Sequence, residues 1–119
     1  MSNTATALLV KFLITVVLAG IAFAIINRNP WGWILLVAIL ATAINYLIGD
    51  LLVLPATSNI IASIADGVMG ALLAYIVDLM TPKFNTTATS LIAFGVLVAV
   101  GEYFFHQYLV TKEDVEPKM

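Results

Sequence analysis

Four uninterrupted apolar stretches, each long enough to cross a bilayer, dominate this 119-residue sequence. They run over residues 5–26, 31–54, 59–80 and 86–110. The hydrocarbon core of a membrane is about 30 Å thick, and a helix that rises about 1.5 Å per residue needs about 20 apolar residues to cross it. Because the stretches lack the two-residue alternation of a membrane β-strand, we predict four transmembrane helices and not a barrel.

Each break between the stretches contains residues that stop a helix. Residues 27–30 combine two asparagines with a proline, Pro55 precedes the hydroxyls of Thr57 and Ser58, and residues 81–85 contain another proline. Connections this short make consecutive helices antiparallel. We therefore predict an all-α, integral membrane, up-down-up-down four-helix bundle with both termini on the same side. It forms a single domain over residues 1–110, followed by a polar tail at 111–119.

The composition agrees with membrane residence and excludes several classes of function. Only 10% of the residues are charged, whereas soluble domains have about 25%. A net charge of −2 without a basic cluster lacks the electrostatic signature of a nucleic-acid-binding protein. The absence of cysteine excludes disulfides and thiol chemistry. No basic region precedes the first apolar stretch, so we expect a retained span and not a cleaved signal peptide.

Basic residues near the helix ends favour a cytoplasmic location for the two termini. On the terminal side lie Lys11, Lys112 and Lys118, against Arg28 and Lys83 on the opposite side. Cytoplasmic ends of membrane helices carry the excess of lysine and arginine. We therefore expect a multi-pass cell-membrane protein whose termini face the cytoplasm.

Ionisable residues inside the predicted helices lie at a similar depth. Lys11, Asp50, Asp66 and Glu102 fall about 6 to 12 Å below the terminal-side surface, and His106 lies one helical turn nearer that surface. A charged side chain at the centre of a membrane helix costs at least about 2.5 kcal/mol, so each one needs a partner or a purpose. We predict that these residues form a buried polar cluster in the terminal-side half of the bundle.

Small and polar residues gather on one face of the third helix and on one face of the fourth. These faces comprise Asn59, Ser63, Asp66, Gly70 and Ala74 in the third helix and Gly95, Ala99, Glu102 and His106 in the fourth. Small residues let membrane helices approach closely, and polar side chains can then bond across the contact. We expect the third and fourth helices to meet along these faces.

The second helix carries a similar polar face, formed by Thr42, Asn45 and Gly49. Asp50 lies about 100° from the centre of that face on an α-helical wheel. We therefore expect Asp50 to face a loop, a neighbouring subunit or the membrane interface.

The predicted cluster admits more than one chemistry. Lys11 can pair with Asp66 or with Glu102, which offsets part of the cost of burying each charge. The remaining carboxylates must be protonated, bind a cation, pair with a charged His106 or reach water. Structural pairing and a proton or cation role therefore both stay open.

Neither catalysis nor a metal centre is predicted. Glu102 and His106 are four residues apart and share a helical face, but two ligands without cysteine or a second histidine are too few for a typical zinc site. The single histidine has no convincing serine nucleophile beside an oxyanion-stabilising glycine motif. We expect no catalytic residue, no metal site and no cofactor.

One segment of the chain is similar to a known family. Residues 46–55, with the sequence YLIGDLLVLP, are followed by Thr57, Ser58 and Asn59 and then by Asp66. This segment resembles the YndM-like family of small uncharacterised membrane proteins of Bacillus-type bacteria. The pair Lys11 and Phe12 and the layout of four spans are also similar to that family. The resemblance implies a four-helix membrane protein of unknown function. Ala56 departs from the family, which often has a basic residue after the proline.

Together these observations favour a non-enzymatic structural or assembly protein whose polar cluster fixes the register of the helices. An alternative is a small proton- or cation-coupled transporter or channel that acts as a homo-oligomer, in which Asp66 and Glu102 exchange protons and Lys11 tunes them. A third is a groove for lipid head groups. The expected partners are the lipid bilayer, a second copy of the chain and a small cation or proton, but no nucleic acid.

Overall fold

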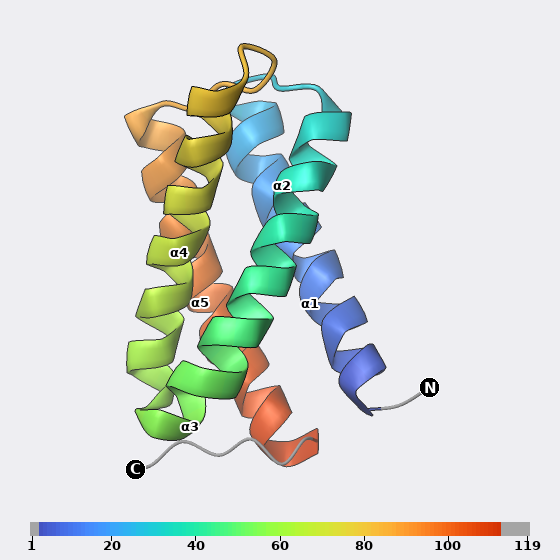
Figure 1. The fold of residues 1–119 in the computed structure, drawn as a ribbon, viewed down its shortest axis with the longest axis vertical. Coiled ribbons are helices and arrows are strands. Elements are labelled where there is room, and N and C mark those ends of the chain that lie inside the picture. The colour runs from blue at the N-terminus through green and yellow to red at the C-terminus, as the bar shows by residue number, and fades with distance from the viewer. Residues whose placement is uncertain (1–2, 113–119) are drawn as a thin grey trace.

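The computed structural model describes residues 3–112, which form an elongated bundle of four long helices (Figure 1). The bundle measures 40 × 29 × 21 Å along its principal axes. In chain order the elements are α1 (Asn3–Ala19), the π-helical η1 (Gly20–Ile25), α2 (Trp31–Ile44), the π-helical η2 (Asn45–Val53), the short α3 (Leu54–Ala56), α4 (Asn59–Met80) and α5 (Ala88–Lys112).

Four segments are long and apolar enough to cross a membrane, which confirms the prediction of an all-helical chain with four apolar spans. They are Thr4–Ile25, Trp31–Ala56, Asn59–Met80 and Ala88–Gln107. The third span coincides at both ends with the prediction. Of the polar tail predicted at 111–119, residues 113–119 lie outside the described residues, and α5 extends to Lys112.

The fourth helix begins two residues later than predicted because of its capping residues. The main-chain amide of Ser90 donates to Thr87 Oγ1 at 3.2 Å, and that of Thr87 donates to Ser90 Oγ at 2.9 Å. This reciprocal arrangement satisfies amides that the first turn of a helix leaves without partners. Thr87 is therefore the capping residue, and α5 starts at Ala88.

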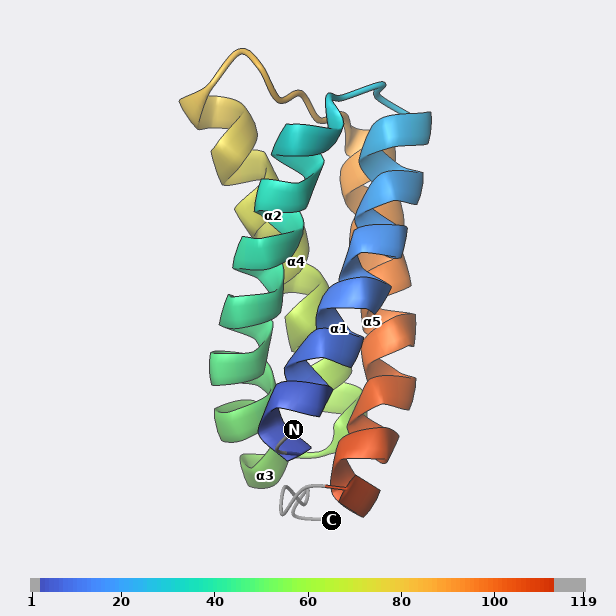
Figure 2. The ribbon, with the colours of Figure 1, turned by 90° about the vertical axis from the view of Figure 1, so that its right-hand side faces the viewer.

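The helices form a closed ring in which neighbours along the chain run antiparallel. α1 packs beside α2 and α5, and α4 completes the ring between α5 and the α2–η2 helix (Figure 2). The start of α1 and the end of α5 lie at the same end of the bundle (Figure 1). The connections over residues 26–30 and 81–87 close the opposite end, where Arg28 takes a positive φ of 55°.

The two halves of the bundle have different interiors. Near the loops that join α1 to α2 and α4 to α5, the core is apolar and centres on three aromatic rings. The ring of Phe23 lies 5.2 Å from that of Phe84 and 4.9 Å from that of Phe94. In the half that holds the start of α1 and the end of α5, charged and polar side chains are buried instead.

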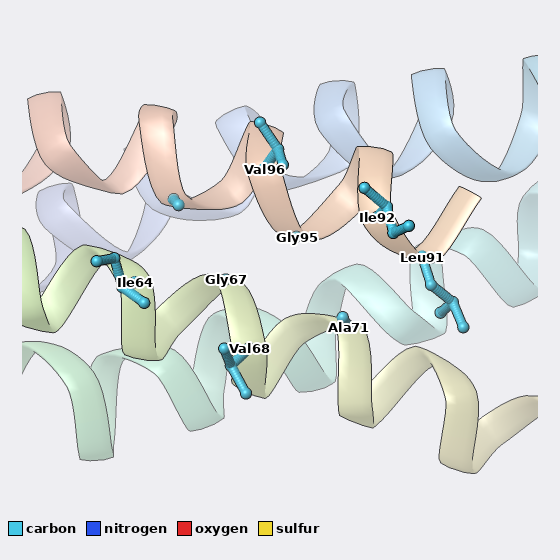
Figure 3. A pocket seen from close by; sticks show the side chains of 9 residues that line it. Ile64, Gly67, Val68, Ala71, Leu91, Ile92, Gly95 and Val96 are labelled. Carbon is cyan, nitrogen blue, oxygen red and sulfur yellow. The ribbon is translucent and has the colours of Figure 1, made fainter. Parts of the chain in front are cut away.

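The outer surface is apolar, as a lipid-facing surface must be. Large hydrophobic side chains on all four long helices are exposed, including Leu13, Leu52, Leu72 and Phe104. Between α4 and α5 this surface forms a shallow apolar groove of about 370 Å³, floored by small residues such as Gly67 and flanked by branched ones (Figure 3).

Close approach of α4 and α5 depends on the glycines between them. A Cβ atom added to Gly67 would overlap the main-chain oxygen of Gly95, and one added to Gly95 would lie 3.3 Å from the main-chain oxygen of Gly67. The two backbones are therefore in direct contact, as small residues permit in membrane helix pairs. This contact agrees with the expected meeting of the third and fourth helices.

Gly67→Ala should therefore destabilise the bundle. The added methyl group meets backbone and not a movable side chain, so we expect a loss of about 1 to 3 kcal/mol in the free energy of unfolding. Thermal unfolding in detergent measures the change. Gly32→Ala is the matched control, because a Cβ atom at Gly32 meets nothing within 4 Å. Equal midpoints for the two variants would contradict the proposed contact.

Candidate functional site

All four long helical segments contribute to one buried cluster of charged side chains. Its members are Lys11 from α1, Asp50 from η2, Asp66 from α4, and Glu102 and His106 from α5. Glu102 is 3% exposed and the other four are 0% exposed. The structure thus brings together the five residues that the sequence analysis named as candidates. We refer to them below as the ion-pair cluster.

Lys11 binds two of the three carboxylates. Its Nζ donates a hydrogen bond to Glu102 Oε1 and lies 3.1 Å from Asp50 Oδ2. The same ammonium group lies 4.8 Å from the centre of the Phe105 ring, a cation–π contact that the sequence analysis missed. Ninety-four positions separate Lys11 from Phe105, and no local pattern connects them.

His106 links the other two acids. Its Nε2 lies 2.6 Å from Asp50 Oδ1 and 3.0 Å from Asp66 Oδ2, and 3.8 Å from Glu102 Oε1. Asp50 and Glu102 each contact both Lys11 and His106, and Asp50 lies closer to the imidazole. The five side chains therefore form one continuous network.

The partners of the imidazole ring also define its protonation state. Asn59 Nδ2 donates to the main-chain oxygen of Tyr103 at 2.9 Å, which fixes Asn59 Oδ1 as the atom 2.8 Å from His106 Nδ1. An amide oxygen only accepts, so Nδ1 must donate. Nε2 faces carboxylates, which also accept. When Asp50 and Asp66 are both ionised, each ring nitrogen carries hydrogen and His106 is an imidazolium cation, whereas a protonated acid would itself donate to Nε2.

The expectation that Asp50 faces a loop, a neighbouring subunit or the interface is wrong. The helical wheel assumed 100° per residue through position 50, but residues 45–53 are π-helical, and the amide of Leu54 bonds to the carbonyl five residues earlier, at Gly49. The wider turn of a π-helix advances each residue by a smaller angle. This change of register turns Asp50 inward, toward Lys11 and His106.

The predicted supporting residues divide into two groups. Asn45, Asn59 and Ser63 touch the ion-pair cluster: Asn45 Nδ2 lies 3.5 Å from the main-chain oxygen of Asp66, and Ser63 Oγ lies 3.2 Å from His106 Nδ1 and 3.1 Å from Asn59 Oδ1.

Gly70 and Gly95 are packing positions outside the cluster. A Cβ atom at Gly70 would meet the Phe94 ring at 3.2 Å, and Gly95 faces Gly67. Gly49 has a more direct role, because a Cβ atom there would overlap Asp66 Oδ1. The sequence pointed to Gly49 only by placing it on the polar face of the second helix.

The charges within the cluster do not balance. Lys11 and the His106 imidazolium supply two positive charges, and the three carboxylates supply three negative charges when all are ionised. Arg28 and Lys83, the other basic residues with described side chains, are in the connections at the opposite end of the bundle. With all three acids ionised, the ion-pair cluster formed by the described residues therefore carries a net charge of −1, although each acid has a cationic neighbour.

The number of potential metal donors is larger than the sequence indicated. The argument against a metal site counted only Glu102 and His106, but Asp50 and Asp66 join them, and one ligand atom from each lies within 4.8 Å of the others. The π-helical turn that redirects Asp50 is the reason that sequence spacing underestimated this group.

Removing the lysine should cost more stability than removing any surface charge. Lys11→Met keeps an unbranched side chain but leaves three carboxylates against one imidazolium, so we expect a loss of about 3 to 5 kcal/mol in the free energy of unfolding. Adding Glu102→Gln removes one of the unpaired acids and should recover part of the loss. Unfolding in detergent measures both effects.

Lys83→Met is the control for this experiment, because Lys83 is exposed and such surface changes usually alter stability by less than about 0.5 kcal/mol. If Lys11→Met and Lys83→Met unfold at the same temperature, the lysine does not hold the cluster together.

Comparisons with known proteins agree with the membrane assignment. Residues 2–118 match the family described as "Protein of unknown function (DUF2512)". The uncharacterized membrane protein YndM of Bacillus subtilis (strain 168) is 35% identical over 79 residues. The match covers 65% of this chain and 44% of the relative, so the chain spans less than half of that protein's length. No solved structure matches. The resemblance seen in the sequence is confirmed: this chain is a membrane protein that belongs to the DUF2512 family.

Proposed function

We propose that this protein is a non-enzymatic structural or assembly component of the bacterial cell membrane. The observation that carries the proposal is that one ion-pair network joins all four long helical segments at a single level. A network that uses every helix defines how the helices pack.

The physical argument concerns specificity more than stability. Apolar helices in lipid have little hydrophobic drive to prefer one partner or register, because lipid tails are as apolar as leucine. Buried ionic groups add little stability relative to apolar residues, but breaking one pair leaves an uncompensated charge. Arrangements that separate Lys11 from Glu102 or His106 from Asp50 are therefore strongly disfavoured, and one register is selected.

The proposed orientation has both termini in the cytoplasm. Arg28 and Lys83 lie in connections at the end opposite to the start of α1 and the end of α5. Three basic residues on the terminal side against two on the other support this orientation.

A second candidate function is proton- or cation-coupled transport by a homo-oligomer. The net negative charge of the ion-pair cluster supports it, since intramembrane carboxylates are recurrent elements of proton relays. In that case the apolar groove between α4 and α5 is a surface that a second copy can cover. The lipid head-group groove remains a prediction.

Disulfide cross-linking tests the structural proposal, because the sequence contains no cysteine to interfere. A Cβ atom at Gly101 would lie 3.6 Å from Ile14 Cγ2, so Ile14→Cys with Gly101→Cys places two thiols near each other across α1 and α5. We expect rapid cross-linking in otherwise unchanged protein and slow cross-linking when Lys11→Met is added. Gel mobility after mild oxidation reports both rates.

The matched control pairs Ile14→Cys with Val100→Cys, since Val100 is 54% exposed and lies on the outer face of α5. That pair should cross-link slowly with or without Lys11→Met. If Lys11→Met leaves the Ile14–Gly101 pair equally fast, the cluster does not set the position of α1 against α5 and the proposal fails.

Proton flux separates the two candidate functions. The purified protein is reconstituted in vesicles that contain a pH-sensitive dye, and an external pH step is applied. The structural proposal expects the same flux as in protein-free vesicles. Transport would give flux above that level in the unchanged protein, lost in Asp66→Asn and Glu102→Gln but retained in Asp78→Asn, whose carboxylate caps Thr86 outside the cluster.

A further inference from the structure

Several buried oxygen atoms in the polar half of the bundle have no hydrogen-bond partner. Within the described residues they are Thr42 Oγ1, Asn45 Oδ1, Asp50 Oδ2 and both carboxylate oxygens of Asp66. Two of these atoms have ionic partners. Asp50 Oδ2 lies 3.1 Å from Lys11 Nζ, and Asp66 Oδ2 lies 3.0 Å from His106 Nε2. The remaining three, on Thr42, Asn45 and Asp66, have neither kind of interaction.

The oxygens of Asn45 and Asp66 belong to one seam between the α2–η2 helix and α4, and Thr42 precedes Asn45 by one helical turn. Thr42 and Asn45 are one helical turn apart on the same face. The Asn45 amide nitrogen lies 3.5 Å from the main-chain oxygen of Asp66, so that side chain reaches α4 at this residue. Asp66 Oδ1 lies against Gly49, in space that a Cβ atom would fill. Thr42, Asn45 and Asp66 are 6%, 2% and 0% exposed.

The charge and chemistry of the seam restrict what can occupy it. A neutral water molecule can satisfy hydrogen bonds, but it leaves the surplus negative charge of the ion-pair cluster in place. A divalent ion would reverse the sign of that surplus. As an imidazolium, His106 donates from Nε2 toward Asp50 and Asp66, and the ring then offers no lone pair to a softer metal. Oxygen ligands alone favour a hard cation.

We propose that the seam between the α2–η2 helix and α4 binds one monovalent hard cation, such as Na⁺, through Asp66 and Asn45 with Thr42 one turn deeper. The bound cation brings the net charge of the ion-pair cluster to zero. Gly49 is a positioning residue, because it leaves the room in which the Asp66 carboxylate lies. The inference rests on the ion-pair network of the proposed function and does not require transport.

Protons compete with such a cation. The titratable groups that face Asp66 are Asp50 from η2, Glu102 and His106 from α5, and Lys11 from α1 through its contacts with both acids. Protonation of any of the three carboxylates removes the surplus charge. Cation binding is therefore expected to be strongest at alkaline pH, provided that Lys11 and His106 keep their protons.

Thermal unfolding of the full chain in detergent tests the proposal. The midpoint is measured at alkaline pH in NaCl, in KCl and in N-methylglucamine chloride of equal ionic strength. A ligand that binds only the folded state raises the midpoint as its concentration increases. We expect NaCl or KCl to raise it saturably relative to N-methylglucamine chloride, and the effect to decline as the pH is lowered.

Two variants locate the site. Thr42→Val should weaken the apparent cation affinity by roughly tenfold or more. Thr15→Val is the matched control, because Thr15 is 4% exposed in the same half of the bundle and its hydroxyl donates to the Lys11 main-chain oxygen at 2.7 Å. Asp66→Asn leaves a charge-neutral cluster, so it should fold and lose the dependence on NaCl or KCl.

Other outcomes overturn the proposal. Equal midpoints in all three salts would show that a proton or water satisfies the seam. Preferential stabilisation by CaCl₂ or MgCl₂ would exclude a monovalent ion, and a salt effect that persists in Asp66→Asn would place the site elsewhere. The cross-linking test of the structural role is independent, because it can succeed in N-methylglucamine chloride when no cation binds.

Discussion

The cost of placing charge inside a hydrocarbon layer determines how the polar half of this bundle is arranged. No single helix can satisfy the ionisable side chains that it carries: α1 brings only a lysine, η2 and α4 each bring an aspartate, and α5 brings both a glutamate and the histidine. Each charge finds its counter-charge on a different helix. The helices therefore need one another to neutralise their charges. Their outer faces are all apolar and do not favour one neighbouring helix over another.

The π-helical segment η2 is what allows the second helix to take part. In a continuous α-helix, Asn45 and Asp50 would point in clearly different directions. The wider turn over residues 45–53 lets Asn45 reach α4 at Asp66 while Asp50 contacts Lys11 and His106. Single π-helical turns often occur at functional sites. Here the segment supplies two inward-facing polar groups from a helix that would otherwise supply one.

Much of this arrangement follows from sequence, and the part that does not has a physical cause. The length of the apolar stretches predicted the four spans, and the common depth of Lys11, Asp66 and Glu102 predicted their association, because depth depends only on the rise per residue. The direction in which a side chain points around the helix axis is harder to predict, because every local change in the number of residues per turn adds to the error. Asp50 was misplaced for that reason.

Pairings between helices were also beyond the sequence. Lys11 could choose between Asp66 and Glu102 from depth alone, and the structure shows Glu102 with Asp50 as the second partner. The close contact of Gly67 with Gly95 depends on the relative rotation of α4 and α5, which helical periodicity within each helix does not define. The pairing of side chains and the rotation of each helix depend on how residues distant in the sequence pack against one another across the bundle.

The apolar half of the bundle bears on whether the cluster serves transport. A transporter must expose its ion site to each side of the membrane in turn. Between the ion-pair cluster and the opposite end lies a core of fully buried side chains that includes Phe23, Ile34 and Phe94. Passage through that half requires the aromatic core to separate, whereas the cluster lies close to the terminal-side surface. Access from one side only is sufficient for a cation that neutralises the cluster, and it agrees with a structural role for the ion-pair cluster.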